Sequence, residues 1–257
     1  MGQGLLLRQT KILSYLQDVP EVSVLELVQL TGASEATIRR DLLEMEKSTL
    51  LVRTFGGARS AVQQSLVLRT FEQRSMLQHS QKLAIAGCAA KMVKPGMTIV
   101  IDSGTTCWRF ASQLKLRETA PLRIITSALA VIETLGGIKD IEIHLVGGRF
   151  RIGNLDFCGP LSIASFANFH ADIAFLSCDS LIPKIGAFTK DIDSAAISHA
   201  MSSCAEKRIL LCDHTKLDQH DCHRILSPRE IDYVITDMPN DSFTGVPYQV
   251  LLADSPA

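Results

Sequence analysis

The sequence lacks the features of a secreted or membrane protein. None of its seven cysteines forms a C-x-x-C pair, and most lie in apolar runs such as Ile209–Cys212, which is typical of free thiols buried in a reducing compartment. No run approaches the roughly 20 apolar residues that a membrane span needs. Arg8 and Lys11 interrupt the apolar N-terminal stretch, which argues against a signal peptide. These absences predict a cytoplasmic protein with no membrane partner.

An excess of charge of either sign is also missing. The net charge is −1 over 257 residues, which excludes a polycation that binds nucleic acid through its bulk charge. Hydrophobic residues make up 46% of the chain, enough for an ordinary core and too many for a disordered protein. The length fits one large domain or two modest ones.

Helical periodicity dominates the chain before residue 59. The predicted helices cover about residues 5–16, 23–30 and 34–47. Ser23 and Ser34 are expected to cap the second and third helices, and Gly32 supplies the turn between them. A strand is predicted at 50–55, followed by a turn at Gly56–Gly57. This order is typical of a winged helix-turn-helix, which we assign to residues 1–58.

Short β-branched runs alternate with helical patterns from residue 76 onward. The predicted strands are residues 98–101, 123–126, 142–146, 172–177, 208–213 and 233–236. The predicted helices are residues 76–93, 106–116, 128–135, 161–168 and 193–205. This alternation favours a Rossmann-like α/β domain with a mostly parallel sheet at 76–257. Residues 59–75 are expected to be a linker, with a structured segment that clamps the two domains as the alternative.

The third helix is the candidate for reading DNA bases. A buried stripe of Ile38, Leu42 and Met45 leaves another face for solvent, and we expect it to carry the following residues: Thr37, Arg40, Asp41 and Glu44. A recognition helix enters the major groove with its N-terminal end. There Arg40 could pair with guanine and Thr37 could contact a thymine methyl group.

Further candidates for DNA contact lie beside these two residues. Ser34 stands at the N-terminus of the helix, Arg39 suits a phosphate at the groove edge, and Arg53 and Arg59 flank the Gly-Gly turn. Seven Lys and Arg balance seven Asp and Glu over residues 1–60, so the domain is formally neutral and a shallow salt dependence is expected. A three-helix packing module without a DNA role is the alternative from pattern alone.

Several strings resemble the DeoR family of sugar-metabolism regulators. Residues 33–42 read Ala-Ser-Glu-Ala-Thr-Ile-Arg-Arg-Asp-Leu, residues 53–58 read Arg-Thr-Phe-Gly-Gly-Ala, and Arg8 stands four residues before Ile12. The resemblance continues through residues 71–74, 102–106, 147–148, 172–175 and 213–216, and so covers nearly the whole chain. It implies a sensor domain similar to ribose-5-phosphate isomerase. It also implies a repressor of a catabolic operon, released by a phosphorylated sugar and working as a homo-oligomer, a dimer or a tetramer.

The segment Asp102-Ser103-Gly104-Thr105-Thr106 is the candidate effector site. It follows a predicted strand and opens a helix, where backbone N–H groups and the helix dipole favour a phosphate. Lys216 follows another strand and could supply a cation. Gly147 would let a ligand approach the backbone, and Asp172 could receive sugar hydroxyls. We expect no cofactor and no metal.

The chain departs from the family pattern mainly in its second half. Ser127, Ser177 and Ser180 replace an Asn and two glycines, and Ala196 and Ser198 stand where a Glu and a Lys are common. In the first half, Thr49 and Phe55 replace a frequent Gly and His. These departures predict an altered or weakened effector pocket.

Two rival functions remain on the sequence. A sugar-phosphate isomerase fused to a helix-turn-helix needs a carboxylate base, and the helix at 193–205 lacks an obvious glutamate for that role. Metal or redox sensing would use a group of ligand-type residues close in sequence: Cys212, His214, His220, Cys222 and His223. Their spacing matches no zinc pattern. A regulator without catalytic residues is therefore the preferred interpretation of the sequence.

Overall fold

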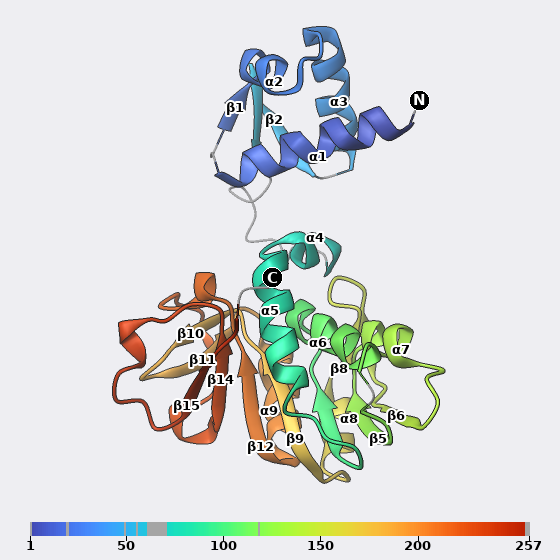
Figure 1. Cartoon of the computed structure of the whole chain (residues 1–257), viewed down its shortest axis with the longest axis vertical. Helices are drawn as coiled ribbons and strands as arrows, with labels where there is room; N and C mark the ends of the chain where they lie inside the picture. Colours follow the sequence, from blue (N-terminus) through green and yellow to red (C-terminus); the bar gives the residue numbers. More distant parts are fainter. Residues whose placement is uncertain are drawn as a thin grey trace. The chain divides into compact units, whose positions relative to one another are not determined.

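The computed structural model describes residues 2–18, 21–48, 50–54, 56–60, 71–117 and 119–254. Within the helices and strands, the side chains of residues 2–7, 17, 18, 21, 59 and 60 lie outside the description. The chain divides into two compact units, residues 1–68 and 69–257, drawn in Figure 1. None of the described helices is long and apolar enough to cross a membrane.

The first unit is a winged helix-turn-helix. Its elements are α1 (Gly2–Asp18), β1 (Glu21–Ser23), α2 (Val24–Thr31), α3 (Glu35–Lys47), β2 (Leu51–Thr54) and β3 (Gly57–Ser60). The predicted caps are confirmed, because Ser23 forms a capping box with Glu26 and Ser34 accepts a hydrogen bond from the Thr37 amide. Gly32 adopts a φ of 71°, which favours glycine between α2 and α3.

The core of this unit includes the predicted stripe of α3. It includes the following buried side chains: Ile12, Leu16, Leu27, Ile38, Leu42 and Met45. Each is at most 4% exposed, so three helices pack around one small apolar centre.

The wing contains a strand that sequence analysis did not predict. Strand β1 pairs antiparallel with β3, which also pairs with β2. A Cβ added to Gly57 would lie 1.9 Å from the carbonyl oxygen of Val22, so a side chain there cannot coexist with this pairing. The glycine therefore serves the close approach of β1 to β3 as well as the turn.

Both described ends of the predicted linker belong to secondary structure. Strand β3 extends to Ser60, and helix α4 covers Phe71–Met76. The ring of Phe71 packs edge-on against Trp108, with centroids 5.7 Å apart. Residues 59–60 and 71–75 are thus parts of folded elements, whereas 61–70 lie outside the described residues.

The second unit is built on a parallel sheet, confirming the predicted α/β class. Among the described residues seven strands pair in the order β15-β14-β12-β9-β4-β5-β6, all parallel. They are β4 (Thr98–Ile101), β5 (Leu122–Thr126), β6 (Ile141–Leu145), β9 (Ala171–Ser177), β12 (Ala205–Leu211), β14 (Tyr233–Thr236) and β15 (Gln249–Leu252). Successive strands run outward from β4 on one side and from β9 on the other. The chain order therefore reverses between β4 and β9.

Helices cover both faces of this sheet (Figure 1). They are α5 (His79–Ala90), α6 (Thr105–Lys115), α7 (Leu129–Leu135), α8 (Pro160–Phe166) and α9 (Ile192–Ser203). Ile99 and Ile101 pack in one cluster with α5, α6 and α7, whereas Val100 packs in the other with α8 and α9. The alternation of side chains along each strand thus feeds two apolar layers.

Smaller sheets lie outside the main one. Strands β7 (Arg149–Arg151) and β8 (Asp156–Cys158) form a hairpin. Strands β10 (Ser180–Ile182), β11 (Gly186–Thr189) and β13 (His223–Leu226) form an antiparallel sheet. These short strands and β15 were not predicted from the sequence, because three or four residues give too little periodicity to detect.

Candidate functional site

The exposed side of α3 carries most of the predicted DNA contacts. The hydroxyl oxygens of Ser34 and Thr37 lie 2.9 Å apart, which fixes both at the N-terminus of the helix. Arg39 pairs with Glu35 at 3.4 Å on the surface. Arg40 is exposed and forms no ion pair with any described residue. Its guanidinium is therefore available to a base edge without breaking an existing contact.

Arg53 lies on the wing strand β2 and is also half-exposed. Its Nη1 is 3.7 Å from Glu46, and its amide donates to the same carboxylate at 3.1 Å. Surface pairs of this kind contribute little, so a phosphate can replace the carboxylate at Arg53 or at Arg39. The side chain of Arg59 and all of Phe55 and Thr49 lie outside the described residues.

Asp41 is not on the solvent face, which corrects the sequence analysis. It is 2% exposed and accepts hydrogen bonds from Arg8, with Nη2 of Arg8 3.2 Å from Oδ1. Asp41 stands three positions after Ile38, and three helical steps of 100° bring it back to within about 60° of the buried stripe. The acidic residue of the Arg-Arg-Asp-Leu string thus serves the fold of the domain.

In the second unit, the predicted effector loop lies at the carboxyl edge of the sheet, where the strand order reverses. Asp102 follows β4, and its Oδ2 accepts hydrogen bonds from the amide and the hydroxyl of Ser177, at 3.0 and 2.8 Å. Its Oδ1 accepts from the Ser103 amide at 2.7 Å. Burial raises the pKa of Asp102, while these hydrogen bonds act in the opposite direction. Asp102 therefore ties β4 to β9 and presents few free lone pairs to a ligand.

Helix α6 begins in this loop without a side-chain cap. Gly104 occupies the N-cap position, and a Cβ there would lie 2.0 Å from Oγ of Ser177. Thr105 and Thr106 are 6% and 1% exposed. The hydroxyl of Thr106 has no hydrogen-bond partner among the described residues. Free amides and a free hydroxyl at a helix N-terminus suit an anion.

A second chain of contacts starts at Ser103. Its hydroxyl donates to Asp156 at 2.7 Å, and Asp156, fully buried, accepts two hydrogen bonds from Arg151 at 2.6 and 2.8 Å. Arg151 also contacts Asp191, the N-cap of α9. Because Arg151 is held between two carboxylates, its pKa is raised although burial opposes this. The β7–β8 hairpin is thereby fixed to the effector loop.

Lys216 approaches the same edge from the loop after β12. Its Nζ donates to the carbonyl oxygen of Cys178 at 2.7 Å. Burial disfavours its charge, but Asp213 and Asp179 outweigh this and raise its pKa. Oδ2 of Asp213 is buried and has no hydrogen-bond partner among the described residues. Lys216 therefore lies close to a carboxylate with an unused acceptor.

The structure places one more cation here that was not assigned from the sequence. Lys82 of α5 is 4% exposed and donates to the carbonyl oxygen of Arg74 at 2.6 Å. Burial and the nearby charge of Lys216 lower the pKa of Lys82 to about 7. A signal was present in the sequence, because Lys82 shares a helical stripe with buried Ile85 and Ala86.

Buried polar atoms without a partner in the described residues gather at this edge. They include Thr106 Oγ1, Ser127 Oγ, Ser180 Oγ, Asp213 Oδ2 and Thr236 Oγ1. Ser127, Asp213 and Thr236 lie at or just after the carboxyl ends of β5, β12 and β14. Buried polar groups are normally hydrogen-bonded, so these atoms are candidate contacts for a polar ligand along this edge.

Of the remaining predicted effector residues, Asp172 lies apart from this cluster, and Gly147 lies at the same edge, beside the end of β5. Asp172 accepts a hydrogen bond from the Thr98 amide at 2.7 Å, and both residues lie at the amino ends of their strands, so Asp172 lies at the opposite edge of the sheet. Gly147 follows β6, an outer strand, and its carbonyl accepts from Ser162. The close approach is made by Gly148, where a Cβ would meet Ser162 Oγ at 2.0 Å.

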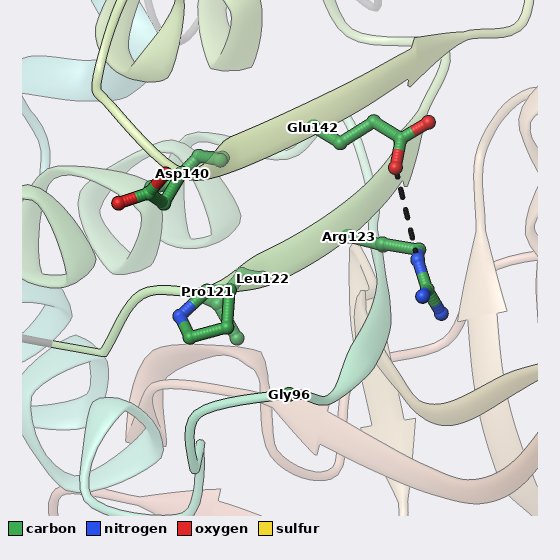
Figure 2. A pocket seen from close by; sticks show the side chains of 7 residues that line it. Gly96, Pro121, Leu122, Arg123, Asp140 and Glu142 are labelled. Atoms are coloured by element: carbon green, nitrogen blue, oxygen red, sulfur yellow. Dashed lines mark ion pairs between the residues drawn. The ribbon is translucent and has the colours of Figure 1, made fainter.

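A hollow of about 400 Å³ lies at the amino ends of β5 and β6 (Figure 2). Its wall includes the ion pair of Arg123 and Glu142, in which both side chains are about 60% exposed. Figure 2 shows Asp140 pointing away from this pair. Ligands of open parallel sheets bind beyond the carboxyl ends of strands, and this hollow is at the other edge. It therefore adds nothing to the candidate effector site.

The residues considered for metal binding lie in different environments. Cys212 is fully buried, Cys222 is exposed, and Nδ1 of His214 lies 2.6 Å from Asp237. Across the described ranges no three His, Cys, Asp or Glu side chains are grouped in a way that could hold a metal ion.

Comparison with known families matches both units. The DeoR-like helix-turn-helix domain matches residues 8–64, and the DeoR C-terminal sensor domain matches residues 77–238. The chain belongs to the DeoR family. It is thus a DNA-binding transcriptional regulator of the DeoR repressor type, and the packing-module alternative is excluded.

Named relatives agree with this assignment. The chain is 30% identical over 93% of its length to a protein of Escherichia coli O157:H7 named as a putative aga operon transcriptional repressor, covering 89% of that protein. It is 30% identical over 90% of its length to the lactose phosphotransferase system repressor of Lactococcus lactis, and the match covers 90% of that repressor. Ribose 5-phosphate isomerase A of Methanocaldococcus jannaschii matches 53% of each chain at 20% identity and a TM-score of 0.38. This likeness is too weak to assign a function.

Proposed function

We propose that this DeoR-family regulator represses a carbohydrate-catabolism operon and is released from DNA by a phosphorylated sugar. The observation that carries the effector is the uncapped N-terminus of α6, with the free hydroxyl of Thr106 beside it. Lys216 and Lys82 add positive charge at the same edge. The relatives named above regulate an aga operon and a lactose phosphotransferase system, which favours a carbohydrate.

The effector pocket is proposed to differ from that usual in the family. Ser127 and Ser180, two of the departures from the family pattern, place unpartnered buried hydroxyls at this edge. Ser177, another departure, fills the space between Gly104 and Asp102. We therefore expect an effector other than the most common sugar phosphates, and tight binding of a common one in calorimetry would exclude this difference.

The DNA contacts are proposed to be made by the wing and the tip of α3. Arg40 and Thr37 would contact base edges, while Arg39, Arg53 and Ser34 would contact phosphates. Because its DNA target is there, we place the protein in the cytoplasm, acting as a homo-oligomer, a dimer or a tetramer, on paired half-sites.

Arg40→Ala should abolish sequence-specific retention of genomic DNA fragments at moderate salt. Loss of one bidentate base contact removes about 1–3 kcal/mol of discrimination. Lys47→Ala is the matched control, since it removes the same charge from the far end of the same helix. The wild type should retain fragments that share a short motif, and the control should retain the same set. Equal enrichment of that motif by Arg40→Ala would show that Arg40 does not read bases.

Thr106→Val should weaken effector binding without lowering stability. Valine keeps the shape of threonine, and the hydroxyl that it removes has no partner within the described residues. Calorimetry with D-ribose 5-phosphate, D-glucose 6-phosphate, D-fructose 6-phosphate and inorganic phosphate should show weak binding to the wild type, through the phosphate group that these probes share with the effector. The variant should bind about 3–10-fold more weakly. If none of these probes binds the wild type even weakly, a phosphate subsite at the N-terminus of α6 is excluded.

A further inference from the structure

Arg74 stands on α4, the first described helix that follows the DNA-binding unit along the chain. Its Nη2 donates to Oδ1 of Asn154 at 2.7 Å and to the carbonyl oxygen of Gly153 at 3.2 Å. Both acceptors lie in the turn between β7 and β8, about eighty positions later in the sequence. The Nε of Arg74 is buried and has no hydrogen-bond partner among the described residues.

The guanidinium of Arg74 lies within electrostatic range of the effector cluster. Burial lowers its pKa, and the carboxylates of Asp179, Asp156 and Asp102 act in the opposite direction. Asp102 and Asp156 are the residues that hold the effector loop in place. Arg74 is thus a partly desolvated cation. Its Nη2 now donates to an amide oxygen and a carbonyl oxygen, both of which are neutral.

Helix α4 is attached to both helices that bear the candidate effector donors. The ring of Phe71 packs on Trp108 of α6, four positions after Gly104. Nζ of Lys82, on α5, donates to the carbonyl oxygen of Arg74 itself. Helix α4 therefore contacts both α6 and Lys82. A shift of either one on effector binding would act directly on α4.

We infer that Arg74 is a ligand of the effector's phosphate group and that its recruitment displaces α4, the helix through which the sensor connects to the DNA-binding unit. This inference rests on the proposed effector site. A guanidinium binds a phosphate dianion through charge-assisted, bidentate hydrogen bonds, which are stronger than its bonds to neutral oxygens. The phosphate therefore competes successfully with Asn154 and Gly153, and Arg74 leaves the β7–β8 turn when the effector binds.

The test compares Arg74→Gln and Arg74→Lys with Glu72→Gln in the full-length chain. Glu72 is exposed on the same helix and serves as the matched control. Calorimetry with the four phosphorylated probes named above should show binding to Arg74→Gln that is roughly 30-fold or more weaker than to the wild type. Arg74→Lys, which keeps the charge and loses the planar fork, should be intermediate. DNA retention without a probe should be unchanged, and release by the probe should be lost in Arg74→Gln.

The outcomes distinguish a failure of this inference from a failure of the proposed function. If no probe binds the wild type, the proposed effector and this inference both fail. If Arg74→Gln binds a probe and releases DNA as the wild type does, the inference fails and the effector site stands. Weaker binding with full release at saturation would keep the ligand role and overturn the transmission.

A measurement on the wild type covers the case in which Arg74→Gln does not fold. Hydrogen exchange of the amides in residues 71–76 and 149–158 should change when a binding probe is added. The amides of β15, the outermost strand of the sheet, which carries none of the candidate effector contacts, should keep their exchange rates. Unchanged exchange in 71–76 would overturn the displacement of α4.

Discussion

Arg8→Ala should lower the free energy of unfolding of the DNA-binding unit by about 2–4 kcal/mol. The change leaves Asp41 buried, at 3% side-chain exposure, without the guanidinium that now binds both of its oxygens. The effect stays toward the lower part of the range for buried pairs because the Arg8 side chain is 23% exposed. In a unit of this size such a loss is a large share of the total stability, so DNA binding should fall with it.

The measurement separates the two units by their signals. The chain has one tryptophan, Trp108, and it lies in the sensor unit. Urea unfolding followed by tryptophan fluorescence should therefore be the same in Arg8→Ala and the wild type, while the helical circular dichroism should show an earlier transition. Lys11→Ala is the control, because Lys11 is exposed on the same helix. An unchanged dichroism transition in Arg8→Ala would show that the pair does not stabilise the fold.

A double variant distinguishes charge from packing. Arg8→Met combined with Asp41→Leu removes both charges and keeps the apolar volume, so it should recover most of the stability that Arg8→Ala loses. Failure to recover would mean that the ion pair itself, and not the avoidance of a lone buried carboxylate, holds α1 to α3. In either case the pair explains why an arginine and an aspartate occur in these two strings.

Local signals predicted the parts of the fold that depend on neighbours in sequence. Ser23, Gly32 and Ser34 were predicted because capping and left-handed turns select their residue types within a few positions. Six of the seven described strands of the main sheet, all except β15, were predicted because a buried parallel strand is a continuous apolar run. The segment 102–106 was predicted as an effector site because it joins a strand to a helix N-terminus.

Long-range contacts account for what sequence analysis missed. Arg74 meets Asn154, and Arg151 meets Asp191, at separations of 80 and 40 positions, which no local pattern records. Asp172 was misplaced for a different reason. A residue that begins a parallel strand lies at the edge opposite to one that ends a strand, so its position in the predicted strand already argued against a role beside Asp102.

Lys82→Met should stabilise the sensor unit at pH 7 and remove a pH dependence that the wild type shows. Burial and the charge of Lys216 lower the pKa of Lys82 from its ordinary value of 10.5 to about 7. The folded state therefore binds fewer protons than the unfolded state between about pH 7 and 10.5, so this lysine destabilises the fold most below pH 7. The penalty fades as the pH rises through that window. At pH 7 the gain in the variant is at most about 5 kcal/mol, reduced by loss of the hydrogen bond to the Arg74 carbonyl.

The charges that face Lys82 set the sign of this effect. Lys216, Arg74 and Arg109 disfavour its charged form, and Asp213 favours it. Unfolding followed by Trp108 fluorescence should show the advantage of Lys82→Met falling by about 1.4 kcal/mol per pH unit between pH 7 and 10. Lys91→Met, at the exposed end of the same helix, should show no such slope. A difference between Lys82→Met and wild type that is independent of pH would contradict the low pKa.

The same lysine predicts that effector binding takes up protons. A phosphate close to Lys82 favours its charged form and raises its pKa, so near pH 7.5 to 8.5 the complex should bind part of a proton that the free protein lacks. Calorimetry in buffers of different ionisation enthalpy measures this uptake, which should vanish in Lys82→Met together with much of the affinity. Stability gained and response lost in one variant would identify Lys82 as a cation kept in a desolvated place for its anionic ligand.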